Sequence, residues 1–123
     1  MLWLTREDNS FIFLNMSNNK NENTMEFSAM FKALSNEHRL HVFLYLAKYC
    51  IPGELSTERE MRLTVGELGE GLNIAPSTVS HHLKELRQAG LIRMDRKGKN
   101  IECWVEQATV DKIIMFFQQA KGE

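Results

Sequence analysis

A stretch of helical length that begins at Pro76 carries small polar side chains on one face. Its apolar residues, Val79, Leu83 and Leu86, recur at the spacing of a buried helix face. The opposite face presents hydroxyl, imidazole and ammonium groups, which can reach base edges and phosphates of DNA without filling a groove with bulk. We therefore expect DNA contacts from this face, made by Ser77, Ser80, His81 and Lys84, with Thr78 at its margin.

The charge of the chain is distributed unevenly. The formal net charge of -1 argues mildly against a nucleic-acid partner, because binding to DNA phosphates is driven by Lys and Arg. Between Pro76 and Asn100, however, only Glu85 and Asp95 are acidic, against Lys84, Arg87, Arg93, Arg96, Lys97 and Lys99. This segment predicts a local basic surface. We expect phosphate contacts from the basic residues that follow the helix, namely Arg93, Arg96, Lys97 and Lys99.

Two short helices joined by a tight turn must position these side chains. Thr64 followed by Glu67 is typical of a capping box and predicts the start of the first helix. Residues 73–75 predict the turn. Pro76 suits the first turn of the second helix because its missing N–H would have no partner there, and Gly90 suits the left-handed position after the helix end.

The remaining elements surround this pair. Apolar periodicity predicts helices over residues 25–34 and about 37–49, followed by a polar connection over residues 51–63. Alternating apolar residues around Trp104 predict a β-hairpin with a basic turn, and a last helix starts near Thr109. The expected order is α-α-α-α-β-β-α. It describes a mainly α protein with a small β-hairpin, a winged helix-turn-helix.

Three segments of the sequence resemble the ArsR/SmtB family of bacterial repressors: FKALSNEHRLHVFLYL, TVGELGEGLNIAPSTVSHHLKELRQAGLI and RMDRKGKNIECWV. The resemblance extends from about Phe31 to Val105, and its most specific part runs from Ser77 to Ile92. It implies a transcriptional repressor that binds a palindromic operator as a homodimer. The recognition helix would lie in the major groove and the wing near the backbone or minor groove.

The resemblance also implies dimer contacts through the first and last helices. The apolar stripes of these helices exceed what the core of a small domain needs, so the residues themselves favour an interface. We expect it to be formed by Phe27, Met30, Phe31, Ile113, Ile114 and Phe117.

The metal sites typical of the family have no recognisable ligands in this sequence. The family's cysteine pair would fall in the segment LTVGEL, which has no thiol, and the last helix has no histidine after Asp111. His38 and His41 lie one helical turn apart beside Glu37, but solvated residues at a helix start explain them better than a metal site. We therefore expect neither a metal nor a cofactor, and the sequence identifies no inducer.

The two cysteines, Cys50 and Cys103, admit two interpretations. They could form a dithiol sensor, but Cys103 alternates with Ile101 and Val105 and so fits a small apolar residue of the wing strand better. The sequence indicates neither a disulfide framework nor a secretory signal. We therefore expect a cytoplasmic protein.

The length of 123 residues and the charged fraction of 25% suit one globular domain, which we place at residues 25–120. Residues 1–24 form an N-terminal extension. Its Asn-rich part predicts mobility, and its apolar start could be a short helix, a strand or residues upstream of a later start codon.

Other classes of function have weaker support. No stretch approaches the length of an apolar membrane span. The sequence has no glycine-rich phosphate loop, no HExxH motif and no nucleophile with a recognisable base, so we do not expect an enzyme. The alternative to DNA binding is a winged-helix module that binds protein.

Overall fold

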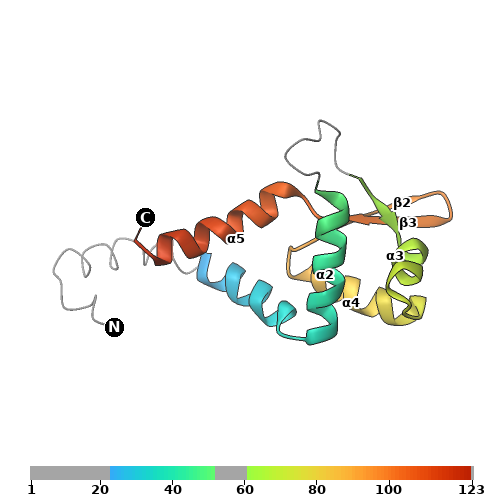
Figure 1. Ribbon diagram of the computed structural model, residues 1–123, viewed down its shortest axis with the longest axis horizontal. Coiled ribbons are helices and arrows are strands. Elements are labelled where there is room, and N and C mark those ends of the chain that lie inside the picture. Colours follow the sequence, from blue (N-terminus) through green and yellow to red (C-terminus); the bar gives the residue numbers. More distant parts are fainter. Residues whose placement is uncertain (1–22, 52–60, 123) are drawn as a thin grey trace.

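The computed structural model describes residues 23–51 and 61–122 of the chain (Figure 1). A helix over residues 23–34 precedes α2 (Glu37–Cys50). The helices α3 (Val65–Leu72) and α4 (Pro76–Gln88) form the predicted pair, and α5 (Gln107–Ala120) is the last element. The expected order of helices is confirmed.

A small antiparallel sheet accompanies the helices. Its strands are β1 (Leu63–Thr64), β2 (Arg93–Lys97) and β3 (Asn100–Trp104), in the order β1-β3-β2. The hairpin of β2 and β3 is the predicted wing, whereas β1 is an addition. A strand of two residues is too short to show alternation in the sequence, and its pairing with β3 depends on a distant partner.

Two predicted segments lie largely outside the described residues. Of the N-terminal extension, only residues 23 and 24 are described, and they already belong to the first helix, two residues before the expected start at Met25. The connection after α2 is described only at its ends. There the N–H of Met61 donates to the carbonyl of Cys50 at 3.3 Å, which brings the two ends of the connection together.

Local signals explain where most helices begin and end. Thr64 Oγ1 accepts from the N–H of Glu67 at 3.1 Å, and the Glu67 carboxylate accepts from the N–H of Thr64 at 2.8 Å, so the predicted capping box is present. Gly90 follows α4 with φ of 79°, in the left-handed region as expected. The last helix starts earlier than predicted, at Gln107. No capping signal marks this start, since Glu106 at the N-cap makes no side-chain capping bond.

The core lies where α2, α3, α4 and β3 meet. Val79, Leu83 and Leu86 of α4 are fully buried, and Leu46 of α2 and Leu68 of α3 are buried with them. The apolar face predicted for α4 is therefore the face that packs into the protein.

The helix over residues 23–34 lies beside α5 (Figure 1). Aromatic rings join the two helices: Phe27 stacks on Phe116 with centroids 4.3 Å apart, and Phe31 lies 5.4 Å from Phe117. Lys112 pairs with Glu26 across the same seam.

The turn between α3 and α4 depends on two backbone features. Asn73 adopts the left-handed conformation with φ of 57°, and the N–H of Ile74 donates to the carbonyl of Gly69 at 2.9 Å. The turn approaches α3 so closely that a Cβ on Gly69 would lie 3.0 Å from the carbonyl oxygen of Ile74. Glycine at position 69 therefore sets how closely the turn packs on α3.

Two glycine substitutions in the same helix test this close approach. A Cβ on Gly66 would meet only Thr64 Oγ1, at 3.9 Å, so Gly66→Ala should raise the free energy of unfolding by up to about 1 kcal/mol through helix propensity. Gly69→Ala gains the same propensity but forces the turn apart, and we expect it to be about 1–3 kcal/mol less stable than Gly66→Ala. Urea unfolding measures both, and equal stability of the two variants would contradict the packing argument.

Candidate nucleic-acid interface

The polar face of α4 is free of the core. All five of its predicted contact residues are exposed, whereas the intervening apolar residues are buried. The five are Ser77, Thr78, Ser80, His81 and Lys84. Since the opposite face is fixed in the core, these hydroxyl, imidazole and ammonium groups are held toward solvent on one side of the helix.

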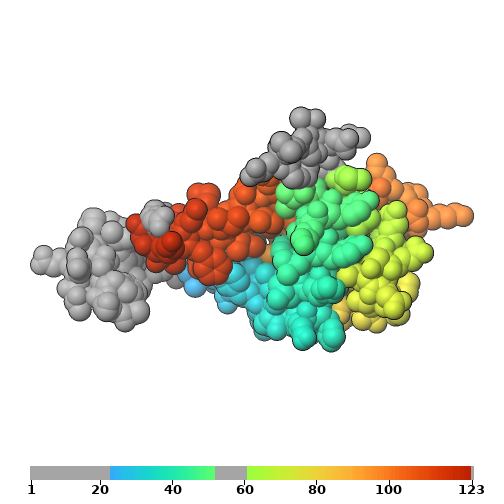
Figure 2. Space-filling model, in the orientation of Figure 1, coloured from blue at the N-terminus to red at the C-terminus, as the bar shows by residue number. Residues whose placement is uncertain are grey.

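The wing projects beyond α3 and α4 as a narrow ridge (Figure 2). In its ladder, Met94 lies opposite Cys103 and Arg96 lies opposite Ile101. Alternation along the strands therefore places Arg96 and Ile101 on the face that continues the core toward the hairpin turn. Lys97 falls on the other face of the hairpin.

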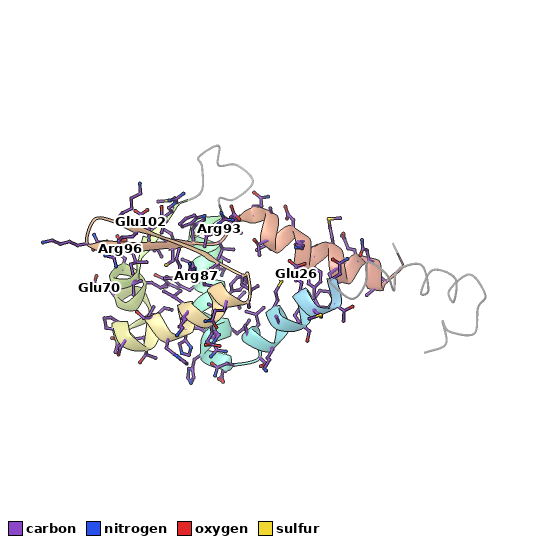
Figure 3. The ribbon with its side chains drawn as sticks, turned by 180° about the vertical axis from the view of Figure 1, so that it is seen from behind. Glu26, Glu70, Arg87, Arg93, Arg96 and Glu102 are labelled. Atoms are coloured by element: carbon purple, nitrogen blue, oxygen red, sulfur yellow. The ribbon has the colours of Figure 1, made fainter. Side chains whose placement is uncertain are left out.

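The basic residues of the wing differ in their surroundings. Arg93 lies at the base of the hairpin near the start of α5, and its guanidinium is 3.5 Å from the Glu106 carboxylate (Figure 3). Arg96, Lys97 and Lys99 are exposed farther along, and none has an acidic partner among the residues the structure describes. The predicted basic surface is therefore concentrated near the hairpin turn.

Arg62 fixes the base of the wing from the side. Its guanidinium lies 3.7 Å above the centre of the Trp104 ring and 3.6 Å from the Glu102 carboxylate. No pattern in the sequence predicts this contact, because Arg62 belongs to the predicted connection and Trp104 is far along the chain. The contact ties β3 to the segment that leads into α3.

His82 is the buried neighbour of the exposed His81. It is 8% exposed, and its Nδ1 has no hydrogen-bond partner within the described part of the chain. Burial lowers the pKa of His82, and the nearby charges of Arg39, His81 and His38 lower it further. His82 therefore packs inside, whereas His81 faces solvent.

The two cysteines lie in the core rather than at the surface. Cys50 and Cys103 are both fully buried, and Cys103 Sγ donates to the carbonyl of Leu63 at 3.3 Å. Burial raises the pKa of the Cys103 thiol to about 12, and the nearby Cys50 adds to the shift. Cys103 therefore remains a protonated thiol at neutral pH, which favours the structural interpretation over a reactive sensor.

The residues expected to form a dimer differ in how far they are buried. Phe27 and Met30 are buried within the chain itself, and Phe31 and Ile113 are partly buried. The first two are thus buried by the chain itself and have little surface left to contact a partner. Ile114 and Phe117 are 48% and 53% exposed, and the neighbouring Met115, which the sequence did not single out, is 56% exposed.

Neither a cluster of metal ligands nor a membrane-spanning helix occurs in the part of the chain that the structure describes. Within residues 23–51 and 61–122, no group of three or more His, Cys, Asp and Glu side chains could hold a metal ion. None of the helices in these residues is long and apolar enough to cross a membrane.

An exposed polar helix behind a tight turn, flanked by a basic hairpin, defines the class of winged helix-turn-helix proteins. A family model described as a helix-turn-helix domain matches residues 34–95 of the chain. The chain is also 31% identical, over 97 residues, to YbzH, an uncharacterised HTH-type transcriptional regulator of Bacillus subtilis. The aligned region covers 76% of this chain and 97% of the relative. This protein therefore belongs to the helix-turn-helix family of DNA-binding transcriptional regulators.

Solved structures have the same fold. An ArsR-like transcriptional regulator from Rhodococcus sp. RHA1 superimposes with a TM-score of 0.65 at 19% identity, covering 82% of this chain and 84% of that one. The homodimeric winged helix-turn-helix DNA-binding domain of Mb0332 from Mycobacterium bovis gives a TM-score of 0.60 at 20% identity, covering 85% of each chain. The fold is thus that of ArsR-like winged helix-turn-helix regulators, in agreement with the resemblance found in the sequence.

The buried His82 predicts a pH dependence of stability. The unfolded chain binds a proton near the ordinary pKa of 6.5, but the folded chain resists it, so the free energy of unfolding should fall as the pH drops below 6.5. For one proton, the free energy of unfolding cannot change by more than about 1.4 kcal/mol per pH unit. Urea unfolding between pH 8 and 5 should show a weaker dependence for His82→Leu than for the wild type.

The exposed His41 supplies the control. His41→Ala should keep the wild-type pH dependence. A His82→Leu variant whose stability varies with pH as the wild type does would show that other groups cause the effect.

Proposed function

We propose that the protein is a dimeric transcriptional repressor that binds a palindromic operator, with α4 in the major groove and the wing on the neighbouring backbone or minor groove. The observation that carries this proposal is the division of α4 into a fully buried apolar face and a fully exposed polar face. The membership in a family of transcriptional regulators supports it.

In this proposal the polar face of α4 reads base edges. Ser80 and His81 stand near the middle of the exposed face, and Ser77 and Thr78 lie in the first turn, with Lys84 toward the other end. Short side chains allow the helix to lie deep in the groove, and the imidazole and hydroxyl groups can donate or accept according to the base.

The wing supplies contacts that do not depend on sequence. Arg96, Lys97 and Lys99 are the exposed basic residues near the hairpin turn, and their charges suit phosphates. Arg93 also belongs to the proposed set, with a smaller contribution because Glu106 offsets part of its charge.

A homodimer would bring two recognition helices to the two halves of an operator. The homodimeric Mb0332 domain and the exposed apolar residues Ile114, Met115 and Phe117 of α5 support this assembly. Residues 25–120 would then form one DNA-binding and dimerisation unit. In this proposal the unit acts in the cytoplasm, where it would meet the operator DNA. The repressor would need neither metal nor catalysis for this role.

Substitutions on α4 and on the wing should affect DNA binding differently. Ser80→Ala or His81→Ala should weaken binding to the preferred site by about 1 kcal/mol while leaving random duplex almost unchanged. Lys97→Ala should weaken both and reduce the slope of log K against log salt by about 1, because one phosphate is no longer neutralised. Electrophoretic shifts with DNA from the protein's own promoter region, at two salt concentrations, measure both effects.

Lys48→Ala is the control for charge, since Lys48 is exposed on α2 and belongs neither to α4 nor to the wing. It should bind as the wild type does. If the wild type fails to bind duplex, or binds with no salt dependence, the repressor proposal is wrong and the protein-binding alternative is favoured. If the α4 and wing variants behave alike, the assignment of the two roles is wrong.

The dimer can be tested with two equally exposed apolar residues. Ile114 on α5 is 48% exposed and Leu44 on α2 is 50% exposed. Ile114→Asp should shift the dimer to monomer in analytical ultracentrifugation and lower operator affinity at least tenfold, because a charge is costly to bury at an interface. Leu44→Asp should remain dimeric. A dimeric Ile114→Asp would contradict the proposed use of α5.

A further inference from the structure

Two buried side-chain nitrogens on neighbouring helices have no hydrogen-bond partner. They are Nε of Arg39, on α2, and Nδ1 of His82, on the buried face of α4. The two helices pack against each other (Figure 1). Among the residues that the structure describes, no other side-chain nitrogen or oxygen is both buried and unpaired. Buried polar groups are nearly always paired in folded proteins, so this pair calls for a specific explanation.

The guanidinium of Arg39 has one edge without a partner. Its Nη1 donates to the carbonyl of Ala33 at 3.2 Å, which is the only hydrogen bond of this side chain within residues 23–51 and 61–122. No carboxylate of these residues lies within ion-pair distance of it. The remaining edge carries Nε and Nη2, whose parallel N–H groups can bind both oxygens of one carboxylate.

The groups around these nitrogens are basic. Each charge that acts on His82 lowers its pKa, so none of them is a carboxylate. These charges are those of Arg39, His81 and His38. The rings of His81 and His82 have centroids 5.8 Å apart. Because His38 and His81 are exposed and Arg39 is partly exposed, this basic cluster of four residues adjoins solvent.

An anion suits the basic cluster better than a cation does. Within the described residues, no group of three or more His, Cys, Asp and Glu side chains could hold a metal ion, and the permanent charge of Arg39 would repel one. An anion can accept from Arg39 Nε and also from His82 Nδ1 when that nitrogen is protonated. The planar edge of the guanidinium favours a carboxylate among anions.

From these observations we infer that the basic cluster between α2 and α4 binds the carboxylate of a small organic acid, which accepts hydrogen bonds from Arg39 Nε and His82 Nδ1. The two nitrogens are covered, so binding requires a shift of the side chains around them. A negative charge beside His81 would oppose the attraction of α4 for phosphates, so the acid would act as an inducer. Only this last step rests on the proposed function.

NMR titration of the wild type with acetate, propionate and benzoate tests the site. At constant ionic strength, at least one of these acids should move the ring signals of His82 in a saturable manner and raise its pKa, because a bound carboxylate favours the charged imidazole. The Nε–H signal of Arg39 should move with the same midpoint. Sodium chloride and sodium sulfate are the control anions, and neither should give this response.

Substitution of the guanidinium makes the test specific. Arg39→Lys keeps the charge but lacks the two parallel donors, so it should bind the acid at least about tenfold more weakly. Arg87→Lys is the matched control, since Arg87 is exposed on α4, and it should bind as the wild type does. Circular dichroism should show that both variants fold.

Three results would overturn the inference. A water that bridges the two nitrogens would satisfy both, and the His82 signals would then move no more with the three acids than with chloride. Equal shifts with sulfate would contradict a carboxylate site. A folded Arg39→Lys variant that binds the acid with wild-type affinity would contradict the role of the guanidinium.

The effect on DNA is measured separately. At an acid concentration that saturates the site, operator binding by the wild type should weaken at least about fivefold, at the lower end of usual allosteric couplings. The same concentration of chloride is the control, because salt itself weakens DNA binding. Saturable binding of the acid with unchanged operator affinity would overturn the inducer role. Absence of wild-type binding to any duplex would overturn the proposed function, whereas the NMR titration would still decide the site.

Discussion

The orientation of α4 depends on the burial of one of its faces. Val79, Leu83 and Leu86 have no exposed area, and burying each such side chain stabilises the fold by about 1.5–3 kcal/mol. Because the helix repeats every 3.6 residues, fixing these residues in the core also fixes the polar residues between them toward solvent. A rotation of α4 that withdrew Ser80 and His81 would have to expose this apolar surface. The candidate interface is therefore held rigidly by packing.

The wing is held relative to α4 by contacts from distant parts of the chain. Cys103 donates to the carbonyl of Leu63 across a separation of 40 residues, and Arg62 covers Trp104 from the same segment. The raised pKa of Cys103 keeps its thiol protonated, so the sulfur retains its donor. These contacts hold the base of the hairpin against the segment that leads into α3.

How well the sequence predicts a feature depends on how far apart along the chain the interacting residues lie. The faces of α4, the capping box at Thr64 and the left-handed Gly90 arise from residues within a few positions of one another, so the sequence predicted them. The strand β1 and the Arg62 contact depend on partners that only the fold brings close. Periodicity also placed Phe27 on the apolar face of a helix, but it could not show which part of the protein covers that face. In the fold, the ring of Phe116 covers it, and only part of α5 stays exposed.

Charge likewise depends on position as well as on composition. The net charge of -1 suggests little affinity for DNA. The charges are unevenly distributed, however, because ion pairs offset some of the acidic residues locally. Glu102 and Glu106 pair with Arg62 and Arg93 at the base of the wing, so their negative charge is offset locally. Exposed ion pairs of this kind add little stability, but each offsets an acidic charge of the wing region with a basic one. The basic residues at the hairpin turn have no acidic ion-pair partner among the described residues, so a nearly neutral protein can present a cationic edge.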